Sequence, residues 1–434
     1  MLFKTMNRIT TTFTAAFGLL LSAGETSAQW VSDSIQMGPG YRNEVFYSFG
    51  AGNQGNSPLL DWELAHTQVK MDNCIRANHV AGVRVVPYPK GDISDWNKFD
   101  TSGWTSWRMV FNDLRKRELG AFNQQKAPGM WDFSWGVYNT TTHEVTGDSM
   151  YLLILNAGTP GQLYRKFYPV KQDASGNLQV RIAALDGSGD TLMNVLSANA
   201  GSRAYKYVHL QKKTQPLREP ASSWDIVFTQ YFAPTFDPMS GKTIPYPVMG
   251  VETNQGVTVA AIRGIDRAAI NPADWESQVV DNLTGIGSNW KSFNRSTNRF
   301  TCADSLSYLI KSADGQYWLL YFSRFDGGST GKVIFAKQQT NLASVQGYGN
   351  TLKWNLYPNP VIRGQALMLA TDASVVHEVL IQICDASGRI VRETSSTLSG
   401  LEQLPISTEG LATGNYFLCL VSAGKKAAIP FILP

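Results

Sequence analysis

Cysteine and histidine are scarce in this sequence, with four cysteines and five histidines among 434 residues. The cysteines, at positions 74, 302, 384 and 419, form no Cys-x-x-Cys pair. Their number and spacing exclude a disulfide-dense scaffold and a zinc ribbon. Cys384 and Cys419 both fall near the C-terminal end, where they either pair with each other or remain two buried thiols.

An excess of charge of one sign is also lacking. The formal net charge is +4, from 38 basic and 34 acidic residues, and no dense basic run occurs. A nucleic-acid surface needs concentrated positive charge, so we expect no nucleic-acid partner.

Common catalytic motifs are missing as well. The sequence contains no Gly-x-Ser-x-Gly elbow, no His-Glu-x-x-His helix and no P-loop. Asp61, Glu63 and Asp225 have the residue type of the paired acids in glycoside hydrolases. They lie, however, at a strand start that recurs along the chain, where a structural hydrogen bond accounts for them. We therefore expect no enzymatic activity.

The N-terminal residues have the pattern of a secretory signal peptide. Lys4 and Arg8 precede an apolar run over residues 13–21, and small residues at 27 and 28 offer a cleavage site. The run has roughly ten residues, whereas a membrane span needs about 20. We expect residues 1–28 to be removed, and no cysteine near the cleavage point indicates a lipid anchor.

Strand signals dominate the rest of the chain. Short runs rich in Val, Tyr, Phe, Trp and Thr alternate with turns that contain Gly, Asn and Asp. Clear examples are residues 151–155, 178–182, 318–322 and 332–336. Helical periodicity is weak. The sequence therefore predicts an all-β protein.

An internal repeat divides the chain. Residues 45–49 correspond to residues 205–209, and residues 61–68 correspond to residues 223–230. Both 61–68 and 223–230 contain a Trp, then an acid and an aliphatic residue, and end in Thr-Gln. Further matches, in the same order, involve Asn78 with Asn254 and the aromatic strands that follow. Six matches in register predict two copies of one β domain, at about 30–195 and 200–340. A polar linker is expected at 341–352.

The C-terminal residues 353–434 read as a small β-sandwich. Three stretches, at residues 356–360, 385–391 and 410–417, resemble the signature stretches of the type IX secretion C-terminal sorting domain of Bacteroidetes. The resemblance implies an immunoglobulin-like fold and transport across the outer membrane by the type IX secretion machinery. It also implies a protein that is secreted or attached to the outer cell surface.

The two repeats resemble the HmuY family of surface haem-binding proteins. The resemblance rests on residues 224–228, 252–256 and 307–318, and more weakly on residues 62–65 and 150–155 of the first copy. It implies two tandem HmuY-like β domains that capture haem and pass it to an outer-membrane haem receptor.

The resemblance also implies where haem ligands would lie, between the Asn-Gly strand and the later aromatic strand. In the second copy this window, residues 257–291, contains neither His nor Met. In the first copy it contains Met109 and Met130, which are the candidate haem ligands. The alternative is that Met109 packs in a core and Met130 is a loop contact, because methionine commonly fills gaps.

A second hypothesis is a surface module that binds a glycan or a protein and keeps the duplicated fold as a scaffold. It rests on tryptophans crowded into the first copy, at positions 96, 104, 107, 131 and 135. These side chains form either a binding platform or ordinary core. His66 is expected to be a buried packing residue, because Phe228 occupies its place in the second copy.

Overall fold

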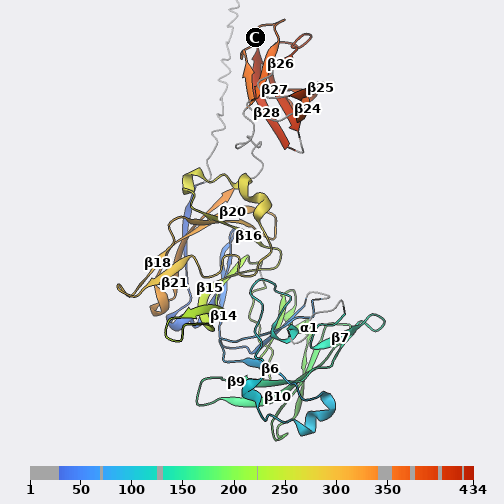
Figure 1. The fold of residues 1–434 in the computed structure, drawn as a ribbon, viewed down its shortest axis with the longest axis vertical. Helices are drawn as coiled ribbons and strands as arrows, with labels where there is room; N and C mark the ends of the chain where they lie inside the picture. Colours follow the sequence, from blue (N-terminus) through green and yellow to red (C-terminus); the bar gives the residue numbers. More distant parts are fainter. Residues whose placement is uncertain are drawn as a thin grey trace, which may run out of the picture.

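The computed structural model describes residues 29–68, 72–124, 131–221, 223–340, 354–371, 377–398, 403–422 and 425–434. Nearly all regular structure in these residues is antiparallel β-sheet (Figure 1). The α-helix in this part of the chain is α1 (Ser197–Ala200), and the remaining helical turns are short 3-10 segments. The expected all-β fold is confirmed.

One β unit is built from two separate parts of the chain, residues 29–58 and 223–340, and we call it the outer unit. Its sheets have the strand orders β1-β21-β20-β19-β16 and β15-β14-β2-β3, with the small hairpin β17-β18 beside them. The two sheets share one core, in which Tyr47, Phe228 and Phe335 are buried together. Its strands are β1 (Val31–Gln36), β2 (Asn43–Ser48), β3 (Gly52–Pro58), β14 (Ile226–Asp237), β15 (Lys242–Thr253), β16 (Thr258–Arg263), β17 (Lys291–Asn294), β18 (Arg299–Cys302), β19 (Leu306–Lys311), β20 (Tyr317–Phe325) and β21 (Lys332–Thr340).

The second β unit lies within the outer unit's sequence, over residues 59–221, and we call it the inserted unit. Its larger sheet runs β12-β11-β10-β8-β7, with β9 between β10 and β6, and a three-stranded sheet runs β13-β4-β5. Leu64, Trp135 and Phe167 are buried in its core. Its strands are β4 (Leu64–Thr67), β5 (Ile75–Ala77), β6 (Arg84–Pro87), β7 (Gly136–Asn139), β8 (Glu144–Gly147), β9 (Tyr151–Leu155), β10 (Leu163–Gln172), β11 (Leu178–Ala184), β12 (Thr191–Val195) and β13 (Tyr205–Val208).

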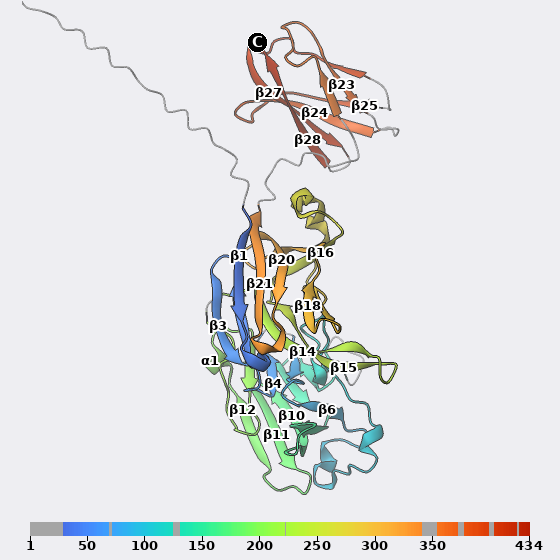
Figure 2. The same ribbon diagram turned by 90° about the vertical axis from the view of Figure 1, so that its left-hand side faces the viewer.

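Strand pairing crosses the boundary that the repeat predicts between residues 195 and 200. β2, from the first sequence copy, pairs with β14 of the second, whereas β13 of the second copy pairs with β4 of the first. In Figure 2 the blue strand β1 accordingly lies beside the orange strand β21. Residues 30–58 therefore complete the fold of residues 223–340, and the expected continuous domain over 30–195 is corrected to a strand exchange between the copies.

The C-terminal residues form a separate pair of sheets. Their strand orders are β22-β23-β26 and β25-β24-β27-β28, and side chains from both sheets share one core. The two facing sheets agree with the expected sandwich. The strands are β22 (Trp354–Tyr357), β23 (Leu367–Thr371), β24 (His377–Asp385), β25 (Ile390–Leu398), β26 (Gln403–Ile406), β27 (Gly414–Ser422) and β28 (Lys425–Leu433).

Candidate binding surface

The candidate haem ligands are only partly placed by the structure. Met109 is half-buried and packs against an aromatic cluster of the inserted unit that includes Tyr88, Trp96 and Phe99. Met130 lies outside the described residues. Met109 thus contacts a core, as the alternative to haem ligation expects, and its own side chain stays partly exposed.

The crowded tryptophans separate into different environments. Trp96 and Trp135 are buried in two different cores, and Trp104 and Trp107 pack half-buried against the aromatic cluster. Trp131 is 40% exposed and its ring stacks on Tyr138. These five side chains do not form one platform.

The two buried histidines of the first copy act as structural residues. His66 is buried in β4, at the position that Phe228 takes in β14, and burial holds its pKa well below the usual value. The Nδ1 atom of His79 lies 2.9 Å from the carbonyl oxygen of Val83, and its Nε2 accepts the backbone N–H of Asn112 at 3.2 Å. Burial lowers the pKa of His79 to about 4, so both rings stay neutral at neutral pH.

The acids at the repeated strand start make equivalent hydrogen bonds in the two units. The Asp225 carboxylate accepts the backbone N–H of Phe49 at 2.7 Å. The Glu63 carboxylate accepts the backbone N–H of Leu210 in the same way. In both cases the acid and the amide come from different sequence copies, so these bonds hold the exchanged strands. Glu63 and Asp225 thus make the structural hydrogen bonds that we expect, whereas Asp61, the third of these acids, forms an exposed ion pair with Lys212.

A buried ion pair holds the seam between the units. Arg218 lies at the end of the inserted unit, and its guanidinium binds the carboxylate of Glu44 in β2 through two nitrogen atoms. Its third nitrogen donates to the hydroxyl of Tyr207 in β13 at 2.7 Å. The guanidinium also lies 5.1 to 5.3 Å from the centroids of three rings, those of Phe46, Trp62 and Tyr207. One cation therefore connects both exchanged strands.

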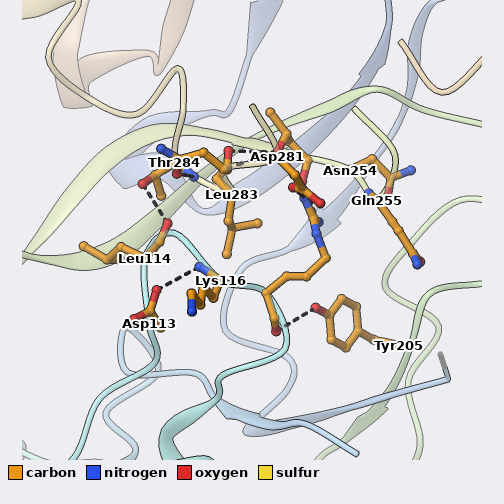
Figure 3. A network of polar contacts seen from close by, with 12 residues as sticks. Asp113, Leu114, Lys116, Tyr205, Asn254, Gln255, Asp281, Leu283 and Thr284 are labelled. Carbon is orange, nitrogen blue, oxygen red and sulfur yellow. Dashed lines mark hydrogen bonds and ion pairs between the residues drawn. The ribbon is translucent and has the colours of Figure 1, made fainter. Parts of the chain in front are cut away.

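A loop of the inserted unit, residues 113–119, completes the seam (Figure 3). The backbone N–H and the hydroxyl of Thr284 both donate to the carbonyl oxygen of Leu114, at 3.1 and 2.8 Å. Arg117 reaches into the outer unit, where it donates to Thr253 and forms a 3.0 Å ion pair with Asp281. The units are therefore joined by backbone and side-chain bonds as well as by strand exchange.

The seam lines a partly open cavity of about 80 Å³. Small-molecule pockets usually measure roughly 300–1,000 Å³, so this cavity accommodates a few water molecules and excludes a porphyrin. Three arginines and three glutamates balance its charge: Arg76, Arg117, Arg218, Glu44, Glu219 and Glu252. Burial raises the pKa of Glu252, and Arg76 opposes the shift. The cavity is part of the seam, since residues of both units line it.

The hairpin β14–β15 is much longer than its counterpart in the inserted unit. Between the equivalent positions Thr229 and Thr253 it has 23 residues, whereas the β4–β5 connection between Thr67 and Ala77 has nine. Figure 2 shows the yellow-green hairpin extending away from the body. Its distal part, residues 233–246, we call the arm. The sister copy forms the same fold without such an arm, so the fold does not require it.

The arm exposes large apolar side chains. Phe236, Met239 and Tyr246 are 63%, 98% and 53% exposed. Side chains alternate along a strand, and Phe236 therefore lies on one face of the ladder while Ile244 and Tyr246 lie on the other. Apolar groups on both faces of a two-stranded ladder indicate a contact surface, because neither face packs on a core.

Prolines shape how the arm can bind. β15 is an edge strand of its sheet, and Pro245 and Pro247 lie in it. A proline supplies no backbone N–H, so this edge is a poor template for an added strand. Recognition at the arm therefore depends on side chains. The base of the arm is fixed by Phe232, whose ring stacks 6.2 Å from that of Phe111 and lies 4.5 Å from the Arg84 guanidinium.

Comparison with known proteins identifies the C-terminal module. Residues 355–433 match the family model of the secretion system C-terminal sorting domain. The chain therefore carries a type IX secretion sorting domain and is a secreted protein, of a kind often attached to the outer cell surface. The sorting domain implies interaction with the type IX secretion machinery.

The remaining comparisons are weaker. No curated protein matches the chain. Among solved structures, it is similar to dimeric latent PorU from Porphyromonas gingivalis, with 10% identity, a TM-score of 0.16, and coverage of 90% of this chain and 34% of that chain. The chain thus spans about a third of that structure. Within the described residues, no helix is long and apolar enough to cross a membrane.

Proposed function

We propose that this secreted protein is a binding module in which the two exchanged β units form a scaffold and the arm contacts a partner protein. The observation that carries the proposal is the exposure of Phe236, Met239 and Tyr246 on a hairpin that only one of the two copies extends. Exposed side chains of this kind are typical of protein contact sites, where aromatic residues and methionine are enriched.

The charge and continuity of the arm support a protein partner. The Asp237 carboxylate accepts the backbone N–H groups of Met239 and Ser240, so the turn satisfies its own acid. Asp237 and Lys242, which are paired in the ladder, are the charged residues of the arm and cancel each other, so its zero net charge suits an apolar, nearly neutral cleft. The contact surface also continues from Phe232, which already packs against the inserted unit.

A photo-crosslinking amino acid placed at Met239 tests this proposal on intact cells that export the protein. We expect a discrete adduct with another protein, which is weakened by the double substitution Phe236→Ser and Tyr246→Ser. The same crosslinker at Ser175, an exposed turn residue of the inserted unit, is the matched control. The proposal fails if position 239 gives no protein adduct, if Ser175 gives the same adduct, or if the adduct is a lipid or a glycan.

A second candidate function, capture of haem for an outer-membrane receptor, is favoured by the half-buried position of Met109 among half-buried Trp104 and Trp107. In this function the thioether of Met109 would bind the iron, and the indole rings would cover the macrocycle. A haemin titration followed by absorbance tests it, with Met193→Ala as the control for Met109→Ala. A Soret shift that Met109→Ala abolishes supports haem capture, and an unchanged spectrum at micromolar haemin rejects it.

A further inference from the structure

Two thiols of the sorting module are in contact. The Sγ atoms of Cys384 in β24 and Cys419 in β27 lie 3.6 Å apart, and both cysteines are unbonded. β24 and β27 are adjacent strands at the centre of a four-stranded sheet. Cys74 and Cys302, in contrast, belong to the inserted unit and the outer unit, so neither competes for this contact.

The contact lies on the outer face of the sheet. Cys419 is paired with Gln382, and Cys384 is two residues further along the same strand, so the two thiols share one face. Ile381 and Ile383 point to the opposite face, into the core of the module. A bond between the sulfur atoms therefore leaves that core in place.

The local backbone favours closure of the remaining gap. Diagonal neighbours in a regular ladder have Cβ atoms nearly 7 Å apart, whereas a disulfide needs about 3.5–4.5 Å. Here β25 carries one extra residue, Val391, opposite Ile383 and Cys384, and such a bulge increases the local twist beside Cys384. Cys384 is also the penultimate residue of β24, where the strand can move most easily. The sulfur atoms then need to approach from 3.6 Å to about 2.05 Å.

We propose that Cys384 and Cys419 form a disulfide once the chain has left the cytosol, and that this bridge locks β24 to β27 in the sorting module. The thiols stay reduced in the cytosol and meet an oxidising environment after export. The bridge joins positions 35 residues apart, so it restricts the unfolded chain between them. The module that directs sorting would thus differ covalently between the two compartments.

The oxidation consumes a disulfide oxidant such as oxidised glutathione or a dithiol oxidase. The thiolate of Cys419, the more exposed of the pair, attacks one sulfur of the oxidant and releases the first thiol. The thiolate of Cys384 then attacks the sulfur of Cys419 and releases the second thiol. Two protons and two electrons leave the pair, and one protein S–S bond replaces the S–S bond of the oxidant. Burial and the neighbouring Cys384 raise the pKa of Cys419 to about 11, so the first step accelerates as pH rises.

The test is to incubate the purified full chain with oxidised glutathione, denature it, and count thiols by alkylation and intact mass. We expect the thiol count to fall from four to two, with a loss of mass equal to two hydrogen atoms and a linked peptide that contains Cys384 and Cys419. The reaction should be faster at pH 9 than at pH 7.

Two variants separate this pair from the other cysteines. The double variant Cys74→Ser and Cys302→Ser should still lose the mass of two hydrogen atoms, whereas Cys384→Ser should gain only glutathione adducts. Four persisting thiols, or stable glutathione adducts on both Cys384 and Cys419 in the unmodified sequence, would overturn the proposal.

Discussion

The buried ion pair at the seam provides the sharpest prediction about how the two units are held together. Arg218→Met removes the guanidinium that binds Glu44 and Tyr207 and keeps a side chain of similar length. The side chains of Arg218 and Glu44 are only 10% and 1% exposed. The substitution therefore leaves the carboxylate of Glu44 buried with Thr229 as its remaining bonded side chain.

The expected magnitude follows from this burial. Removing one partner of a buried pair costs about 3–5 kcal/mol, because the other charge stays desolvated without compensation. Replacing both partners by apolar groups is often nearly neutral. We therefore expect Arg218→Met to lower the free energy of unfolding by about 4 kcal/mol, and the double variant Arg218→Met and Glu44→Met to recover most of that loss.

Urea denaturation with hydrogen exchange detected by mass spectrometry measures this effect in both units at once. Because the units exchange strands, amides of β11 in the inserted unit and of β21 in the outer unit should lose protection at the same urea concentration, and both midpoints should fall together in Arg218→Met. Arg324→Met is the control, since the Arg324 side chain is 66% exposed in its pair with Asp326 and should contribute less than about 1 kcal/mol. Separate midpoints for β11 and β21, or equal effects of the two substitutions, would refute the reasoning.

Three further predictions concern single buried positions. The pKa of His79 is about 4 in the folded chain and 6.5 for an unperturbed histidine, so the unfolded chain binds this proton more readily. The free energy of unfolding should therefore fall by about 3 kcal/mol as pH drops from 6.5 to 4. Urea denaturation at several pH values should show that His79→Gln makes the free energy of unfolding less dependent on pH in this range. Asp225→Ala leaves a buried backbone N–H without its acceptor and should cost about 1–3 kcal/mol in urea denaturation, whereas Asp225→Asn, which keeps an acceptor oxygen, should cost less. Gly147→Ala places a Cβ 1.8 Å from the carbonyl oxygen of Pro169, so it should lower the free energy of unfolding by about 3 kcal/mol and lower the thermal midpoint. Gly161→Ala is the control, because its Cβ would lie 3.8 Å from the nearest atom, the hydroxyl oxygen of Thr159, and should change the thermal midpoint little.

The sequence predicts the repeated elements better than their pairing. The match of Asp61–Gln68 with Ser223–Gln230 correctly identifies β4 and β14 as equivalent strands, and the substitution of Phe228 for His66 correctly indicates a buried position. The exchange is not visible in this similarity, because a match between β2 and β13 does not show whether each strand pairs within its own copy or with the other copy. Only the connection lengths and the packing of the seam decide between the two arrangements.

The arm is absent from the sequence-based prediction for a physical reason. Proline is disfavoured in strands, and Pro234, Pro245 and Pro247 interrupt the alternation that would otherwise indicate a long hairpin. In the structure Pro234 lies opposite Pro245. Antiparallel ladders alternate between hydrogen-bonded and non-hydrogen-bonded pairs, and two prolines fit a non-hydrogen-bonded pair, so the ladder continues through both. The sequence does contain one signal for the arm, which is the number of residues between equivalent positions. More residues separate Thr229 from Thr253 than separate Thr67 from Ala77.

The strand exchange gives the arm a firm base from which to bind. Domains joined only by a linker move relative to each other, and a contact element placed between them would lose conformational freedom on binding. Here β14 is paired on one side with β2 and the seam is held by Arg218 and the loop at residues 113–119, so both units support the base of the arm. A partner that binds Phe236 and Met239 then needs to order only the exposed end of the hairpin. Substitutions that loosen the seam, such as Arg218→Met, should for this reason weaken crosslinking at position 239 without changing any residue of the arm.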